Sequence, residues 1–264
     1  MIDPQVRAEI MRRLRGAQAE HGVHILYACE SGSRAWGFAS PDSDYDVRFI
    51  YAHPAEWYLA FDVDQRRDVI EYPIEDEIDC SGWDLRKAMH LFMRSNGALL
   101  EWLKSPIRYI ESGPFAARMR GLETQAVNLR ALCYHYSHMA RGNARGYLVR
   151  DRVRLKKYLY ALRPLLAIRY IEARQRPPPI EFRRLVEAAA PAAIHPAIEQ
   201  LLTLKRSSSE LGVGPPVIEL NEFIAAELER HSDGFSGHGR PTPVDSAAVR
   251  AALNALFVAV LREA

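Results

Sequence analysis

Apolar residues recur at two different spacings in the first part of the chain. Between Val6 and Ala17 they repeat at helical spacing, which predicts a helix over residues 5–20. Residues 23–29 form an apolar run and residues 44–51 alternate between apolar and polar, and both patterns predict strands. The other elements expected here are a short helix at 54–60, strands at 69–74 and 77–80, and helices at 83–93 and 98–103. These elements together indicate a sheet with helices packed against it.

The pattern changes near residue 113, beyond which helical spacing dominates and strand-like alternation is almost absent. Helices are expected at 114–142, 147–173, 181–190, 194–206, 217–230 and 245–262. The predicted fold class is therefore α+β, with a mixed sheet and its helices at 1–112 and an all-helical domain at 113–264.

Composition narrows the class of protein without revealing its function. Of 264 residues, 48% are apolar and 26% are charged, as in ordinary globular proteins. No apolar run is long enough to span a bilayer, and the N-terminus lacks the apolar core of a signal peptide. The cysteines Cys29, Cys80 and Cys133 are odd in number and lack CxxC spacing, which argues against a disulfide framework or a thiolate zinc site. We therefore expect a cytoplasmic protein with no membrane partner.

The distribution of charge is more informative than the net charge of +2. Residues 56–84 hold ten acidic and two basic side chains, whereas residues 141–174 hold ten basic and two acidic ones. One interpretation is two solvated faces that partly neutralise each other across a domain contact. The other is that the acidic part contains metal ligands and the basic part holds phosphates.

A short motif combines a possible phosphate cradle with paired carboxylates. Gly32-Ser33 follows the predicted strand at 23–29, and after ten more residues Asp44-Tyr45-Asp46 opens the next strand. Residues two apart on a strand share a face, so Asp44 and Asp46 are expected to point the same way and to need a cation between them. Oxygen ligands favour Mg²⁺ or Mn²⁺. Gly32 lets the backbone approach a phosphate, while Ser33 and the amides of a short helix would complete the cradle. The pattern predicts phosphoryl or nucleotidyl transfer, although a solvated turn is the alternative for each half of the motif.

A third carboxylate is expected on a neighbouring strand. Asp79 fits best because its apolar neighbours indicate a sheet interior, where an unpaired acid would be costly. Glu77 shares its face and is the fallback, and Glu71 is a weaker candidate. For each of them the alternative is an exposed acid at a sheet edge.

These residues resemble a known superfamily. The stretches from Ser31 to Gly37 and from Ser43 to Asp46 are similar to the signature of the DNA polymerase β-like nucleotidyltransferases. Residues 79–106 and 156–164 look like a bacterial and phage group of predicted nucleotidyltransferases, some of which are associated with RNA ligases.

The resemblance implies roles for the motif residues. Gly32 and Ser33 would hold the β- and γ-phosphates of a nucleoside triphosphate such as ATP, and Asp44 and Asp46 would bind two Mg²⁺ ions. Asp79 would bind the metal nearer the acceptor and help to deprotonate its hydroxyl, and attack at the α-phosphorus would expel pyrophosphate.

A basic helix offers further nucleotide-binding candidates. Lys156, Tyr160 and Arg163 lie beside an apolar stripe that begins at Leu155, and we expect them to contact the triphosphate, base or sugar. An ordinary basic helix flank is the alternative. Arg34 is expected either to contact phosphate or to pair with an acid of residues 56–84.

The predicted function is metal-dependent transfer of a nucleoside monophosphate to a hydroxyl, with RNA ends as the first choice of acceptor and RNA repair as the process. A protein acceptor, as in an AMP-transferring enzyme, and a non-catalytic nucleotide-sensing or partner-binding module are the alternatives.

Overall fold

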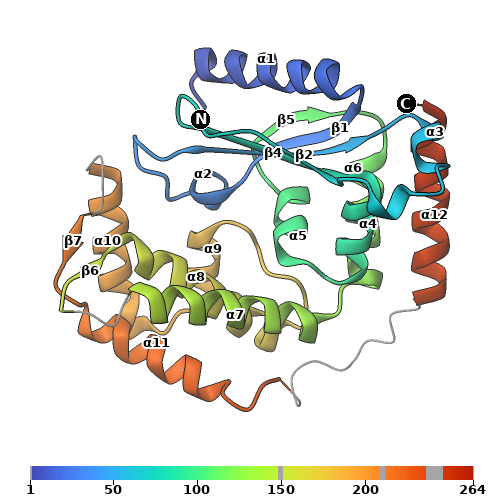
Figure 1. The fold of residues 1–264 in the computed structure, drawn as a ribbon. Coiled ribbons are helices and arrows are strands. Elements are labelled where there is room, and N and C mark those ends of the chain that lie inside the picture. Colours follow the sequence, from blue (N-terminus) through green and yellow to red (C-terminus); the bar gives the residue numbers. More distant parts are fainter. Residues whose placement is uncertain (1, 148–150, 208–211, 236–245, 264) are drawn as a thin grey trace. The chain divides into compact units, whose positions relative to one another are not determined.

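The computed structural model describes residues 2–147, 151–207, 212–235 and 246–263 (Figure 1). These residues form two compact units. One unit takes in the described chain up to Ala35, Asp44–Ala126 and the last helix, α12 (Ser246–Glu263). The other takes in Trp36–Ser43 and the described residues that follow Ala126 as far as Phe235.

A five-stranded mixed sheet is the centre of the first unit. Its strands are β1 (His24–Glu30), β2 (Tyr45–Ala52), β3 (Val69–Glu71), β4 (Ile78–Asp84) and β5 (Arg108–Glu111). They are ordered β3-β4-β2-β1-β5; β2 and β4 run parallel, and the other neighbours run antiparallel. The parallel pair carries Asp46 and Asp79, two of the predicted carboxylates.

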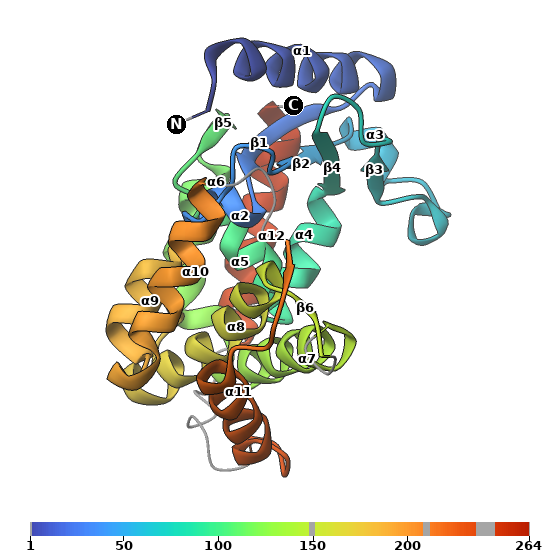
Figure 2. The ribbon, with the colours of Figure 1, turned by 90° about the vertical axis from the view of Figure 1, so that its left-hand side faces the viewer.

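Helices cover both faces of this sheet, with α1 (Pro4–His21) on one side and α4 (Leu85–Met93) and α5 (Gly97–Leu103) on the other (Figures 1 and 2). The remaining helices of the unit are α2 (Gly32–Trp36), α3 (Ala55–Tyr58), a 3₁₀ turn at Val63–Gln65 and α6 (Phe115–Ala126). Helix α1 begins where the Asp3 carboxylate accepts the backbone N–H groups of Gln5 and Val6, and it ends at the left-handed Gly22. Its buried apolar face packs on the sheet, as the helical spacing predicts.

The second unit is built around α8 (Lys156–Arg174), which is buried on nearly all sides between Tyr158 and Ile171. Around it are α7 (Leu129–Tyr147), α9 (Phe182–Ala189), α10 (His195–Ser207) and α11 (Ile218–Arg230), with a 3₁₀ turn at Ala192–Ile194. Two short strands, β6 (Val153–Arg154) and β7 (Val213–Gly214), pair with each other. The α+β class is therefore confirmed. Among the described residues, no helix combines the length and the apolar character that a membrane span requires.

Several element predictions were wrong in detail. Trp83 and Asp84 belong to β4, so the following helix begins at Leu85. The single helix expected at 114–142 is two helices, and the second starts where the Asn128 side chain accepts the N–H of Ala131. Residues 148–150 of the helix expected at 147–173 lie outside the described residues, and α8 itself begins at Lys156. Strand β5 was not predicted at all.

The compact units do not divide at residue 112. The sheet unit also holds α6 and α12, while residues 36–43, between the two halves of the motif, belong to the helical unit. The functional division into a catalytic domain at 1–112 and a nucleotide- or substrate-binding domain at 113–264 stays a prediction.

Candidate active site

Two of the predicted carboxylates face each other across the parallel strand pair. Asp46 of β2 is in register with Asp79 of β4, and both side chains are 29% exposed. Residues in register on neighbouring strands point to the same face. The sheet therefore brings together two acids that are 33 positions apart in the chain, and it does so with rigid backbone on both sides.

Arg48 lies between these two acids and contacts both. Its Nη2 is 3.1 Å from Oδ1 of Asp46 and 2.6 Å from Oδ2 of Asp79, and its Nη1 donates to the Asp79 carbonyl at 2.8 Å. Arg48 was not among the residues predicted from the sequence. The signal was present, because Arg48 is two positions beyond Asp46 on the same strand and therefore shares its face.

Gly32 is packed against the Asp46 carboxylate. Its φ of +56° is in the left-handed region, and a Cβ at this position would lie 1.9 Å from Oδ2 of Asp46. A backbone hydrogen bond holds the preceding residue against the same strand, since the Ser31 N–H donates to the Asp46 carbonyl at 2.8 Å. Ser33 is buried in α2 immediately afterwards. The glycine is required by both space and backbone conformation, and the two halves of the motif meet here.

Asp44 is exposed, just before β2 begins. Its carbonyl accepts the Arg34 Nε–H at 3.2 Å, and the Arg34 guanidinium lies 3.8 Å from the centre of the Tyr45 ring. Among the described residues, no three His, Cys, Asp or Glu side chains are close enough together to hold a metal ion. Asp46 and Asp79 therefore lie together on the sheet. Asp44 is close to Asp46 in sequence, but the three carboxylates do not form a group that could hold a metal ion.

The geometry favours Asp79 over the other candidates for the third acid. Glu77 precedes β4 with a φ of +61° and is exposed. Glu71, on the edge strand β3, forms an exposed ion pair with Arg67. Of the three, Asp79 is the one that is in register with Asp46.

Glu30, at the end of β1, is hydrogen-bonded to the backbone of Asp46. Fully buried, it accepts the Asp46 N–H at 2.9 Å through Oε1 and the Tyr109 hydroxyl through Oε2. Burial raises the pKa of Glu30 to about 7, although both hydrogen bonds oppose this rise. Burial also raises the pKa of Asp46, while the charge of Arg48 acts in the opposite direction. Three acidic side chains, Glu30, Asp46 and Asp79, therefore lie at this corner of the sheet. Arg48 contacts two of them, Asp46 and Asp79.

The nucleotide-binding candidates on α8 lie in an aromatic cluster of the helical unit. The Tyr160 ring packs edge-on against Trp36 and Phe38, with centroid distances of 5.6 and 6.0 Å. Arg163 is 2% exposed, and its guanidinium lies 4.3 Å from the Trp36 ring centre. Lys156 begins α8 nearby. The packing of Tyr160 and Arg163 is structural, and their contact with nucleotide stays a prediction.

Lys205 of α10 is a second basic residue that was not predicted from the sequence. It is 4% exposed, its Nζ lies 5.7 Å from the Phe38 ring centre, and no carboxylate of the described residues forms an ion pair with it. Burial and the neighbouring charge of Lys156 lower its pKa, while Asp42 acts in the opposite direction. A buried cation without an ion-pair partner is costly unless an anion joins it.

The acidic segment 56–84 is neutralised largely within its own unit. Arg13 of α1 pairs with Asp76, and Arg86 and Lys87 of α4 pair with Asp64 and Asp68. Mutual neutralisation with the basic segment is therefore not needed to explain these acids.

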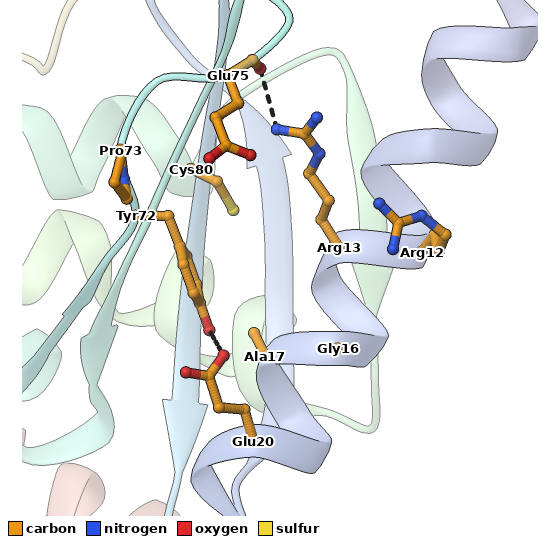
Figure 3. Close-up of a pocket in the computed structure, with 9 residues that line it drawn as sticks. All are labelled: Arg12, Arg13, Gly16, Ala17, Glu20, Tyr72, Pro73, Glu75 and Cys80. Carbon is orange, nitrogen blue, oxygen red and sulfur yellow. Dashed lines mark hydrogen bonds between the residues drawn. The ribbon is translucent and has the colours of Figure 1, made fainter.

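A small pocket beneath α1 shows the same local compensation (Figure 3). It measures about 190 Å³. Arg13 donates there to the Glu75 carbonyl at 2.9 Å, and the Tyr72 hydroxyl donates to Glu20 at 2.8 Å. Arg13 and Tyr72 therefore both find hydrogen-bond partners among the residues that line this pocket.

The strand–Gly-Ser–Asp-x-Asp–strand geometry agrees with the comparison to protein families. A family model described as "RlaP: RNA repair pathway DNA polymerase beta family" matches residues 6–259. The chain belongs to the RlaP family. The predicted membership of the polymerase β-like superfamily is thereby confirmed, and the match takes in the helical unit as well as the sheet unit.

A curated relative of this RlaP family member is found in Bacillus subtilis (strain 168). It is 46% identical over 226 residues, which cover 85% of this chain and 86% of the relative, and it carries the name "Uncharacterized protein YcgL". The comparisons thus place the chain in an RNA repair pathway family and leave its reaction to be argued from the site.

Proposed function

We propose that this protein is a metal-dependent nucleotidyltransferase that moves a nucleoside monophosphate from a nucleoside triphosphate to a hydroxyl at an RNA end. The observation that carries the proposal is the pair Asp46 and Asp79, in register on parallel strands and in contact with one cationic nitrogen. Family membership supports the class of reaction and the choice of RNA.

The residues fit a divalent cation. Oxygens of two carboxylates from different strands approach the same point, where the structure places a positive charge, and hard oxygen donors are the ligands of Mg²⁺ and Mn²⁺. Gly32 allows the backbone to lie against the Asp46 carboxylate, since a Cβ there would collide with it. Asp46 and Asp79 would hold the metal, joined by Asp44 from the preceding turn. When bound, two such ions would neutralise charge on the triphosphate.

The chain's own groups account for the rest of the proposed reaction. The turn at Gly32 and Ser33 binds the β- and γ-phosphates, with Arg34 beside it. Asp79 accepts the proton of the acceptor hydroxyl. The acceptor oxygen bonds to the α-phosphorus as the bond from that phosphorus to the bridging oxygen breaks, and pyrophosphate leaves with the electron pair. Within the helical unit, Lys156 and Lys205 are the basic residues proposed to attract an anionic substrate, and Tyr160 and Arg163 pack in the aromatic cluster of that unit.

The test is a transfer assay that compares the wild type with variants in which one acid is replaced. The purified protein is incubated with Mg²⁺ and each α-labelled nucleoside triphosphate, together with RNAs that differ in their ends and with candidate acceptor proteins. The wild type is expected to label RNA and to release pyrophosphate, and Asp46→Asn is expected to lower the rate by about 10³-fold or more because it removes a metal ligand.

The matched control is Asp76→Asn, which removes one acid of the same unit whose side chain is 82% exposed and pairs with Arg13. It is expected to retain the full rate. Label on protein instead of RNA would identify a protein-modifying enzyme. A biological effect that survives Asp46→Asn would identify a non-catalytic module.

A further inference from the structure

The helical unit has a hollow where α8 ends and α9 passes close by. It measures about 420 Å³. Its wall includes Arg174, Arg176, Arg184, Tyr170, Pro179 and Glu187. Three guanidinium groups against one carboxylate give the wall an excess of positive charge.

One of these arginines is held in place by the fold. The Arg176 Nε donates to the Tyr170 hydroxyl at 2.9 Å, and Tyr170 is itself 7% exposed and so belongs to the core. Pro177 follows Arg176 directly and restricts its backbone to extended conformations. Fixing Nε in this way leaves the outer edge of the guanidinium to a ligand at little further entropic cost.

The arginines of the hollow differ from their neighbours in how their charge is compensated. Nearby, Arg169 pairs with Glu227 at 2.8 Å and Arg183 with Glu199 at 3.1 Å. In the described part of the chain, neither Arg174 nor Arg176 has a carboxylate partner. Arg184 has Glu181 at 3.6 Å, a loose contact on the surface. Two arginines without a carboxylate partner among the described residues and a third with a loose one therefore line the same hollow.

We propose that this hollow binds the phosphate backbone of the RNA acceptor. The inference rests on the proposed function for its choice of RNA. Guanidinium groups match the geometry of phosphate oxygens and can bind them in pairs. Contacts of this kind hold a strand without reading its sequence. The hollow thus supplies affinity for RNA, separately from the carboxylates that carry the chemistry.

The test measures the affinity of the whole protein for a fluorescent single-stranded RNA by anisotropy over a series of KCl concentrations. The variant is Arg174→Ala/Arg176→Ala/Arg184→Ala. Loss of three phosphate contacts is expected to flatten the slope of log affinity against log salt by about 2, from roughly 0.7 per contact, and to weaken binding by about 10- to 100-fold at low salt. Thermal unfolding of each variant checks that it is folded.

Two further variants separate the hollow from a general effect of charge. Arg12→Ala/Arg15→Ala/Arg118→Ala removes the same charge from exposed arginines of the sheet unit and is expected to leave both affinity and slope near those of the wild type. Tyr170→Phe keeps every charge but removes the hydroxyl that holds Arg176, and it is expected to weaken binding about 2- to 5-fold, as for loss of one modest hydrogen bond.

Equal losses in the two triple variants would overturn the proposal, as would a wild-type protein that binds no RNA. Nucleotidyl transfer is scored separately. If RNA binds through the hollow but no nucleotide is transferred, the proposed reaction fails and this inference stands. If nucleotide is transferred while the hollow variant binds RNA normally, the reaction stands and this inference fails.

Discussion

Each unit of the molecule shields a cation from solvent, Arg48 largely and Lys205 almost fully, and the two are compensated in opposite ways. Arg48 in the sheet unit is held between Asp46 and Asp79, with a further bond to a backbone carbonyl. Lys205 in the helical unit is 4% exposed and lies against Phe38 without an ion-pair partner among the described residues.

The two cations are therefore expected to favour different ligands. Arg48 already contacts both acids, so a divalent cation would compete with it for the same oxygens. Lys205 carries the desolvation penalty of a buried charge without a carboxylate to offset it, so a phosphate that joins it brings the missing partner. A metal and an anionic substrate are therefore expected at opposite kinds of sites.

Among these substitutions, the largest effect on activity is expected from Gly32→Ala. The added Cβ has no room beside Oδ2 of Asp46, and the residue must keep a φ of +56°. We expect the free energy of unfolding to fall by about 1 to 3 kcal/mol. Displacement of Asp46 is expected to lower nucleotidyl transfer about 100-fold. Urea unfolding and the transfer assay measure the two effects.

Gly121→Ala is the matched control for this change. Gly121 lies inside α6 without a positive φ, and a Cβ added to it would meet no atom of the described residues within 4 Å. The same substitution is therefore expected to stabilise the protein by about 0.5 to 1 kcal/mol. Similar destabilisation by both substitutions would show that Gly32 is not specially packed against the carboxylate.

The elements of the fold were predictable from the sequence where burial follows a regular period. Helix α1 and strands β1 and β2 have such patterns. Gly82 misled the prediction because glycine usually interrupts a strand; here the Phe49 ring would lie 2.2 Å from a Cβ, so β4 needs the glycine to continue. Strand β5 escaped because it is four residues long and charged at both ends.

The candidate site was predictable as far as local spacing reaches. The motif singled out Gly32 and Asp46, and apolar neighbours pointed to Asp79, but the close packing of Gly32 on Asp46 was not predicted. Register between β2 and β4 is a tertiary property, so the position of Arg48 between the acids emerges from the fold. In the sequence Lys205 resembles any other basic residue of a helix, since its burial depends on Phe38, which is remote in the chain.

Arg48→Met tests the cation that pairs with Asp46 and Asp79. Without the guanidinium, Asp46 and Asp79 face each other unneutralised, and we expect the metal-free protein to lose about 2 to 4 kcal/mol of stability at neutral pH. Mg²⁺ or Mn²⁺ is expected to raise the melting temperature of this variant more than that of the wild type, because the competing charge is gone. Thermal unfolding with and without metal measures this difference.

Arg86→Met provides the contrast, since its partner Asp64 is 83% exposed and the pair contributes less than about 1 kcal/mol. Its response to metal should equal that of the wild type. The competition between Arg48 and metal would be excluded if Arg48→Met and the wild type gained the same melting temperature from Mg²⁺.

Glu30→Gln tests whether the buried carboxyl of the sheet unit makes the stability depend on pH. The pKa of Glu30 is about 7 in the folded protein and 4.5 as the reference for the unfolded chain, so the folded state holds the extra proton between these values. The free energy of unfolding therefore falls as the pH rises from about 4.5 to 7. Gln cannot ionise, so the variant should lose this part of the slope and be more stable than the wild type above pH 7, by roughly 2 to 3 kcal/mol.

Glu111→Gln should act in the opposite direction. Although burial raises it, pairing with Arg120 and Arg108 lowers the pKa of Glu111 overall, so its charged form stabilises the protein at neutral pH. Urea unfolding across the pH range compares the two. A pH dependence that is unchanged by Glu30→Gln would show that the pKa of Glu30 is the same in the folded and the unfolded protein.

Lys205→Met tests the buried cation that has no ion-pair partner among the described residues, and its expected effect on stability is small. Methionine keeps the length of the side chain and its packing on Phe38 but removes the buried charge, so we expect a gain of up to about 1 kcal/mol at neutral pH together with weaker binding of nucleoside triphosphate, by about 10-fold. Lys104→Met, which breaks an ion pair with Glu123, is expected to destabilise the protein and to leave nucleotide binding unchanged. Urea unfolding and equilibrium binding of a fluorescent nucleotide measure both quantities. If Lys205→Met lost stability and bound nucleotide as well as the wild type, Lys205 would be a structural residue and the contrast with Arg48 would disappear.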